Sequence, residues 1–227
     1  MKLEKVTKGE LPAPKRWYDD ACGTALALEF LGERWSLLIL RELMYGPRRF
    51  GEIKANLPGI SANILTQRLD GMEAAGILTR RKLSSPANVQ VYDLTPWGLE
   101  AEPIIQVMGR WAARSKRHDP LAFMSTASAM QSLLTLVDRE GLAGLHATVA
   151  FRFPDDAFVA RLRDGEMSVV REECEAADVT FAGDTLAMRR TIYGKAGVNG
   201  EGLLSVTGDP HVAEQFIDLF RLPEKIA

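Results

Sequence analysis

The chain has 227 residues, of which 46% are hydrophobic and 26% are charged, a composition typical of a folded protein with ample material for packed cores. No apolar run approaches the roughly 18 residues that span a bilayer, and residues 1–10 are too charged for a secretory signal, so we expect a cytoplasmic protein without a membrane partner. Its two cysteines, Cys22 and Cys174, are too few for a disulfide framework.

Charge divides the chain into halves of opposite sign. Residues 1–118 hold 18 Lys and Arg against 13 Asp and Glu, a net of +5, whereas residues 119–227 hold 10 against 17, a net of −7. A net of +5 over this length is weak support by itself, but it suits a first half that lies near nucleic acid. We therefore expect two domains, 1–118 and 119–227.

Four helices are predicted in the first half. Apolar residues at helical spacing predict helices over 22–31, 35–44 and 50–57, each followed by a glycine or a Pro-Gly turn. Ser61 is a suitable N-cap for a fourth helix, in which Leu65, Leu69, Met72 and Gly76 share one face. This leaves the polar side chains of Asn63, Thr66, Gln67 and Asp70 on the outward face.

After Gly76 the apolar period changes from helical to alternating. Residues 77–83 and 89–94 flank a polar turn at 84–88, which predicts a β-hairpin, and Thr95-Pro96 begins another helix with a broad apolar face. This order of elements is typical of a winged helix-turn-helix domain, mainly α with a β-hairpin wing. The polar segment 115–120 is expected to be the linker.

The second half is predicted to be an α+β domain. Helices are expected over 125–139, 185–193 and 211–220, and an alternating half-buried strand over 145–153. Shorter strands are expected at 167–170, 179–181 and 203–206.

Several motifs occur in order along the first half: Leu31-Gly32-Glu33-Arg34-Trp35, Gly46-Pro47-Arg48-Arg49-Phe50, Gly59-Ile60-Ser61, Leu65-Thr66-Gln67-Arg68-Leu69 and Tyr92-Asp93-Leu94-Thr95-Pro96-Trp97-Gly98. Together with Cys22 they resemble the HxlR family of bacterial winged-helix regulators, over roughly residues 20–114. The resemblance implies a homodimeric transcription regulator that binds double-stranded DNA. It also implies that residues 22–30 and 104–114, the first and last helices of the domain, form the dimer contact.

The acidic second half extends beyond the usual length of that family. Residues 177–181, the helix after them, and 203–209 followed by an amphipathic helix look like a sterol-carrier-protein-like domain. Such a domain encloses an apolar tunnel between a sheet and helices, so the resemblance implies that residues 121–227 hold a hydrophobic small molecule. The candidate pocket residues are aromatic: Phe151, Phe153, Phe181, Phe216 and Phe220. The same side chains also suit an ordinary aromatic core.

Short polar side chains on an exposed helix can match the donors and acceptors of base edges in the major groove. The candidate base-contacting residues are Ser61, Asn63, Thr66, Gln67 and Arg68. Without the family resemblance, an ordinary polar helix surface would explain them about as well.

Cations near the hairpin are candidates for phosphate contact. These are Arg80, Arg81 and Lys82 on the first strand, with Asn88 near the tip, and Arg48 and Arg49 before the third helix. The alternative for the strand is a solvated edge guarded by positive charge, and Arg48 and Arg49 suit a solvated turn equally well.

Cys22 lies at the start of a helix, where the helix dipole favours the thiolate, whereas the neighbouring Asp19 and Asp20 oppose it. Some members of the family use a cysteine at this position to sense oxidants or electrophiles, so a redox switch is an alternative to a ligand switch. Cys174 lies among glutamates and is expected to be inert.

No catalytic constellation is visible in the sequence. His118, His146 and His211 lack metal-ligand spacing, and there is no nucleophile elbow or phosphate loop. We expect no cofactor and no enzymatic activity. The rival from another class is a lipid or acyl-ligand carrier, or an enzyme, that uses the winged helix for dimerisation. The acidic half could also recruit another protein or stabilise the dimer.

Overall fold

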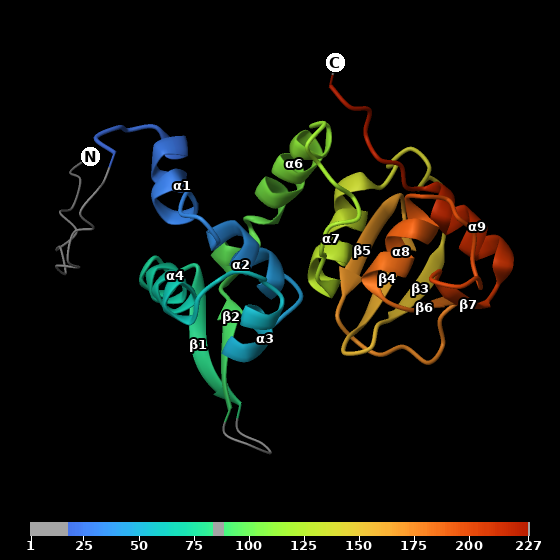
Figure 1. Cartoon of the computed structure of the whole chain (residues 1–227), viewed down its shortest axis with the longest axis horizontal. Helices are drawn as coiled ribbons and strands as arrows, with labels where there is room; N and C mark the ends of the chain where they lie inside the picture. The colour runs from blue at the N-terminus through green and yellow to red at the C-terminus, as the bar shows by residue number, and fades with distance from the viewer. Residues whose placement is uncertain (1–17, 84–88, 227) are drawn as a thin grey trace, which may run out of the picture.

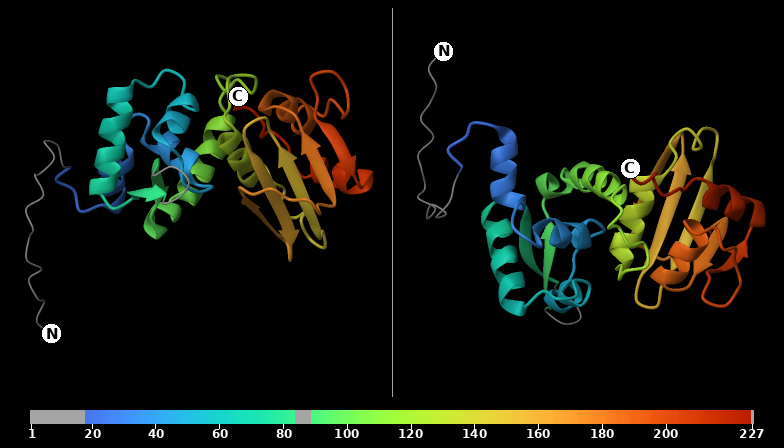
Figure 2. Two further views of the ribbon diagram at one scale, coloured as in Figure 1. Left: turned by 90° about the horizontal axis from the view of Figure 1, so that it is seen from below. Right: turned by 45° about the horizontal axis from the view of Figure 1, so that its top comes forward.

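The structure, a computed structural model, describes residues 18–83 and 89–226. It contains two bodies that lie side by side, each with its own apolar core, and helices α6 and α7 lie between them (Figures 1 and 2). Within the described residues, no helix is both long and apolar enough to cross a membrane.

The first body has the predicted winged-helix order. Its elements are α1 (Gly23–Leu31), α2 (Ser36–Leu43), α3 (Phe50–Ala55), α4 (Ala62–Ala74), β1 (Leu78–Leu83), β2 (Val89–Leu94), α5 (Pro96–Leu99) and α6 (Glu102–Ala113). The helix expected from Pro96 onward is divided into α5 and α6. Gly98 packs so closely on the backbone carbonyl of Ile77 that a side chain there would overlap it, and this contact fixes α5 against the base of the hairpin.

Helical spacing of apolar residues builds the core of this body. Ile39 and Leu43 of α2 and Leu65 and Leu69 of α4 are fully buried and pack in one cluster. The Ser61 hydroxyl accepts a hydrogen bond from the backbone N–H of Ile64 at 3.2 Å, as expected for an N-cap. The buried face of α4 therefore leaves its opposite face to solvent.

The second body is a five-stranded sheet with helices on one face. Its elements are α7 (Thr126–Leu136), β3 (Ala147–Arg152), β4 (Ala157–Arg163), β5 (Glu166–Val170), β6 (Val179–Ala182), α8 (Thr185–Ile192), β7 (Ser205–Gly208) and α9 (Pro210–Asp218). The strand order is β5-β4-β3-β6-β7, with β3 and β6 parallel and the other neighbours antiparallel. The α+β prediction is confirmed, although β4 was not among the predicted strands.

The five phenylalanines predicted to line an apolar tunnel fill the core between this sheet and its helices. Their exposed fractions are between 0% and 8%, and their rings pack on one another, with 5.5 Å between the ring centres of Phe151 and Phe181 and 4.9 Å between those of Phe216 and Phe220. Side chains in such contact leave no room for a ligand among them. The tunnel prediction for these five residues is therefore wrong, and the alternative of an aromatic core is correct.

The two bodies are joined by more than the segment 115–120. Arg48, just before α3, makes a bidentate ion pair with Asp156 of the second body, at 2.9 and 2.8 Å. The Ser125 hydroxyl donates to the buried carboxylate of Glu42 at 2.7 Å, and the Tyr45 hydroxyl donates to Gln131 at 3.1 Å. These contacts attach α2 and the turn after it directly to the second body.

Candidate nucleic-acid interface

The solvent face of α4 carries short polar side chains. Asn63, Thr66 and Gln67 are all exposed. At about 100° per residue they fall within about 100° of one another around the helix axis, opposite the buried leucines. The helix α4 itself lies beside strand β1 of the hairpin (Figure 1). Ser61 is exposed at the start of the same helix, with its hydroxyl oxygen engaged as the cap.

Arg68 does not belong to this face. It lies about 140° around the axis from Asn63, and it donates from Nε to the carbonyl of Arg34 at 3.1 Å and from Nη2 to Glu33 at 2.8 Å. The turn that it holds contains Trp35 in a left-handed conformation, with φ of 85°. The structure thus gives Arg68 a positioning role between α4 and the α1–α2 turn, which does not fit the predicted base contact.

Arg80 of the hairpin also has partners within the domain. It forms ion pairs with Asp70 and Glu73 of α4, and its guanidinium lies 5.5 Å from the ring centre of Tyr92. Because Asp70 shares the outward face of α4, an uncompensated carboxylate there would repel phosphate. Arg80 offsets part of that negative charge, since one guanidinium faces two carboxylates, and sequence alone did not indicate these ion pairs.

The remaining candidate cations differ in how free they are. Arg81 is exposed but paired with Asp93 at 2.6 Å. Lys82 and Arg49 are exposed and have no salt-bridge partner in the described part of the chain. Asn88 lies outside the described residues.

Arg48 does not fit a phosphate contact, because the residue is only 7% exposed and its guanidinium is bound to Asp156. Lys54 of α3, which was not predicted, is a further exposed cation near the α3–α4 turn. Its only signal in the sequence is its place on the helix before α4.

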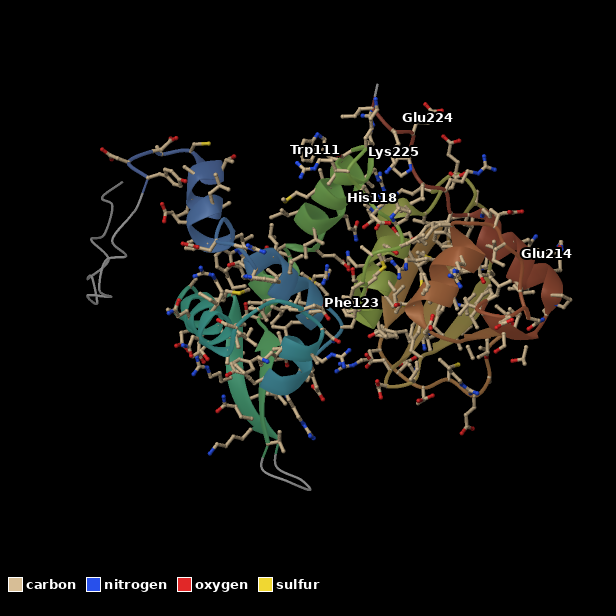
Figure 3. The ribbon with its side chains drawn as sticks, in the orientation of Figure 1. Trp111, His118, Phe123, Glu214, Glu224 and Lys225 are labelled. Carbon is tan, nitrogen blue, oxygen red and sulfur yellow. The ribbon has the colours of Figure 1, made fainter. Side chains whose placement is uncertain are left out.

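A second surface of the first body is apolar. On α6, Val107 is 70% and Trp111 is 74% exposed, and on α1 Leu26 and Leu28 are 42% and 50% exposed. Both helices lie on the side of the body away from the point where β1 ends and β2 begins, and Trp111 lies at the outer end of α6 (Figures 1 and 3). A large exposed apolar surface of this kind marks an interaction site.

Cys22 lies at the N-cap of α1 and is fully exposed. The backbone N–H and the hydroxyl of Thr24, with the backbone N–H of Ala25, stabilise the thiolate and lower the pKa of Cys22 below its ordinary value. Asp20 accepts the backbone N–H of Cys22 at 2.9 Å, and its carboxylate does not reverse this shift.

A two-helix unit with an exposed polar second helix, followed by a hairpin, defines a winged helix-turn-helix DNA-binding domain. Residues 30–120 match the model of the HxlR-like helix-turn-helix family. The chain is 36% identical over 87 residues to the HTH-type transcriptional regulator YvaP of Bacillus subtilis, covering 38% of this chain and 80% of that protein. It is 38% identical over 86 residues to YodB of the same organism, covering 38% and 77%. The chain belongs to the HxlR family of transcriptional regulators.

Solved structures similar to this chain include quinone-bound YodB from B. subtilis, which is 36% identical in sequence and has a TM-score of 0.35. The match covers 39% of this chain and 93% of that chain. The redox regulator HypR in its oxidised form has 28% identity, covers 43% and 100%, and has a TM-score of 0.40. The family model ends at residue 120, so the sheet of the second body lies beyond the matched region.

Proposed function

We propose that this regulator binds DNA as a homodimer, with α4 of each protomer in the major groove. Asn63, Thr66 and Gln67 read base edges, and Ser61 lies at the helix start where bases and backbone are both in reach. The observation that carries the proposal is the exposed polar face of α4, held by a fully buried apolar face beside the hairpin.

Phosphate contacts are assigned to Arg49, Lys82 and Arg81, and also to Asn88, which lies outside the described residues. Arg49 and Lys82 are the stronger assignments because both are exposed and unpaired in the described part of the chain. Arg81 would exchange Asp93 for a phosphate on binding. Arg80 acts indirectly, through Asp70 and Glu73.

The dimer contact is assigned to α1 and α6. Both helices expose large apolar side chains, and α1 has no buried residue in the single chain. Burial of such a surface against its own symmetric copy would remove it from water. Residues 1–118 then form the DNA-binding and dimerisation domain, and residues 119–227 form a regulatory domain that takes a hydrophobic small-molecule effector.

Selection from a pool of random duplex DNA with the purified full chain tests this function. We expect an enriched inverted repeat whose half-sites are about 10 base pairs apart, the spacing of successive major grooves on one side of the helix. A pool that stays unenriched, at a salt concentration where nonspecific binding is weak, would contradict the proposal.

Cys22 supports a second candidate function, regulation by oxidants or electrophiles. YodB has a quinone-bound structure and HypR is described as a redox regulator. In this chain the supporting observation is a fully exposed thiol whose pKa is lowered at the start of α1, the helix assigned to the dimer contact. Cys22→Ser separates the two candidates: it abolishes a response of DNA binding to quinone or diamide and leaves a response to a small apolar effector intact.

A further inference from the structure

An apolar cavity of about 530 Å³ lies where the two bodies meet. It is bounded by α2 and α6 of the first body and by α7 and α8 of the second. Its apolar lining includes Leu37, Leu38, Ile105, Met108, Met124 and Leu136. Cavities of this volume hold drug-sized ligands.

The polar groups of this cavity are positive or neutral. Among the described residues, none that lines it carries a carboxylate. The hydroxyl groups of Ser132 and Tyr193 lie 2.8 Å apart and share one hydrogen bond. Arg41 and Arg189 contribute guanidinium groups, and Arg41 is already paired with Glu42.

Arg189 is the unusual group. It is 6% exposed and has no ion pair in the described part of the chain. Nε donates to the carbonyl of Thr185 at 3.0 Å, and Nη1 donates to the carbonyls of Pro120, at 2.8 Å, and Ala122. These acceptors are neutral, and Nη2 has no hydrogen-bond partner among the described residues.

Desolvation lowers the pKa of Arg189, although the charges of Asp184 and Asp119 raise it in part. An arginine nevertheless stays protonated at neutral pH. A buried cation without a counter-ion costs free energy, which an anion at the free guanidinium edge would recover.

We propose that this cavity binds a small molecule with an apolar body and one anionic group, such as a carboxylate or sulfonate, with the anionic group at Arg189. The proposal rests on the proposed regulatory role of the second domain. It places the ligand between the two bodies, and not in the core of the sheet where the sequence predicted it. The apolar walls take the body of the molecule, and the Ser132–Tyr193 pair offers a further polar contact.

The position of the cavity couples a ligand to the DNA-binding body. Leu37 and Leu38 on α2 form one wall, and the same helix is tied to the second body through Glu42 and Ser125. The helix α6, which carries the apolar surface assigned to the dimer, forms another wall. A ligand that favours one spacing of these helices would change the spacing of the two α4 helices in a dimer.

Two fluorescent probes with the same aromatic frame test the anionic group. Anilinonaphthalene sulfonate carries a sulfonate, and phenylnaphthylamine lacks it. Arg189→Gln should weaken sulfonate binding by about tenfold or more, the loss of a charge-assisted hydrogen bond, and should change phenylnaphthylamine binding much less. Arg190→Gln, an equal charge change at the exposed neighbour, should change neither.

Gly109 on α6 provides a test that does not touch the Arg189 contacts. A Cβ there would lie 3.6 Å from Thr135, an ordinary contact, so Gly109→Ala is tolerated and leaves most of the cavity open. Gly109→Phe should fill the cavity and abolish binding of both probes. For each probe, the measured stoichiometry should fall by one molecule per chain.

The inference is overturned if Gly109→Phe binds both probes like the parent, or if a folded Arg189→Gln binds the sulfonate unchanged. Because α6 also carries the surface assigned to the dimer contact, the mass of Gly109→Phe is measured alongside. If that variant loses its oligomeric state, the Arg189→Gln result alone decides the test. The DNA selection tests the proposed function separately. If the chain enriches a DNA sequence but binds neither probe, only the ligand proposal is contradicted. If it binds the probes but enriches no DNA sequence, only the proposed function in DNA binding is contradicted.

Discussion

Several arginines that the sequence offers as candidates for DNA contact have partners within the protein. The arginines with such partners are Arg48, Arg68, Arg80 and Arg81. A guanidinium group can bind a phosphate, a carboxylate or a backbone carbonyl, so residue type alone does not show which of these an arginine contacts. Arg49 and Lys82 have the exposure that a phosphate contact needs.

Arg68→Ala tests the positioning role. It removes hydrogen bonds to Arg34 and Glu33 at the surface, so unfolding stability should fall by about 1 kcal/mol. Affinity should fall alike for all DNA sequences, because the α1–α2 turn loosens while the base-contacting face stays intact. Lys54→Ala is the control for stability, since Lys54 is exposed on α3. A changed base preference in the Arg68 variant would show direct base contact instead.

The thiol of Cys22 gives a pH-dependent prediction. Because Thr24 and Ala25 stabilise the thiolate, the pKa is lowered, so alkylation by iodoacetamide should reach half its maximal rate below the ordinary thiol pKa of about 8.5. Thr24→Val removes the hydroxyl and should shift the midpoint upward. A midpoint above the ordinary value, or no response to Thr24→Val, would remove the basis for a reactive thiol.

At the scale of elements, those with strong local signals could be predicted. Ser61 caps α4 and Thr95 caps α5 as expected, and the hairpin follows its alternating pattern. The strand β4 lacked such a signal because Phe158, Val159 and Ala160 are all fully buried, so the apolar run has no alternation. The break between α5 and α6 depends on the packing of Gly98 on Ile77, a contact that no local pattern encodes.

Substitutions on helix α6 test the proposed dimer contact. Val107→Glu combined with Trp111→Glu places two charges on its most exposed apolar positions and should dissociate the dimer, because charged groups are costly to bury in an interface. Light scattering coupled to size-exclusion chromatography measures the mass. The same change at His211 and Gln215 of α9, far from α6, is the control. A variant of unchanged mass would exclude α6 from the dimer contact.

At the scale of the whole molecule, the second domain is packed on the first. The charge division at residue 118 indicated two parts, and two cores are present. Their contact could not be predicted, because Arg48 and Asp156 are 108 residues apart. From the sequence alone, Arg48 could equally contact a phosphate or water, and Asp156 could be solvated. The cavity between the bodies follows from that contact, which is why the sequence pointed to the phenylalanine core instead.

A double-mutant cycle at Arg48 and Asp156 tests the packed arrangement. Both side chains are about nine-tenths buried, so Arg48→Met leaves an unpaired carboxylate and should cost about 3 to 5 kcal/mol of stability. Adding Asp156→Leu should recover a large part of that loss, measured by denaturant unfolding. Strictly additive effects would mean that the two bodies do not share this contact in solution.

The most direct test of the account is the binding of variants of α4 to the DNA sequence that selection yields. Gln67→Ala and Asn63→Ala should each lose about 1 to 3 kcal/mol of affinity and relax the preference at one position of each half-site. Lys82→Ala should weaken binding to all sequences alike and reduce the salt dependence by about one charge. If the two α4 variants keep both the affinity and the sequence preference of the parent, α4 is not the recognition helix.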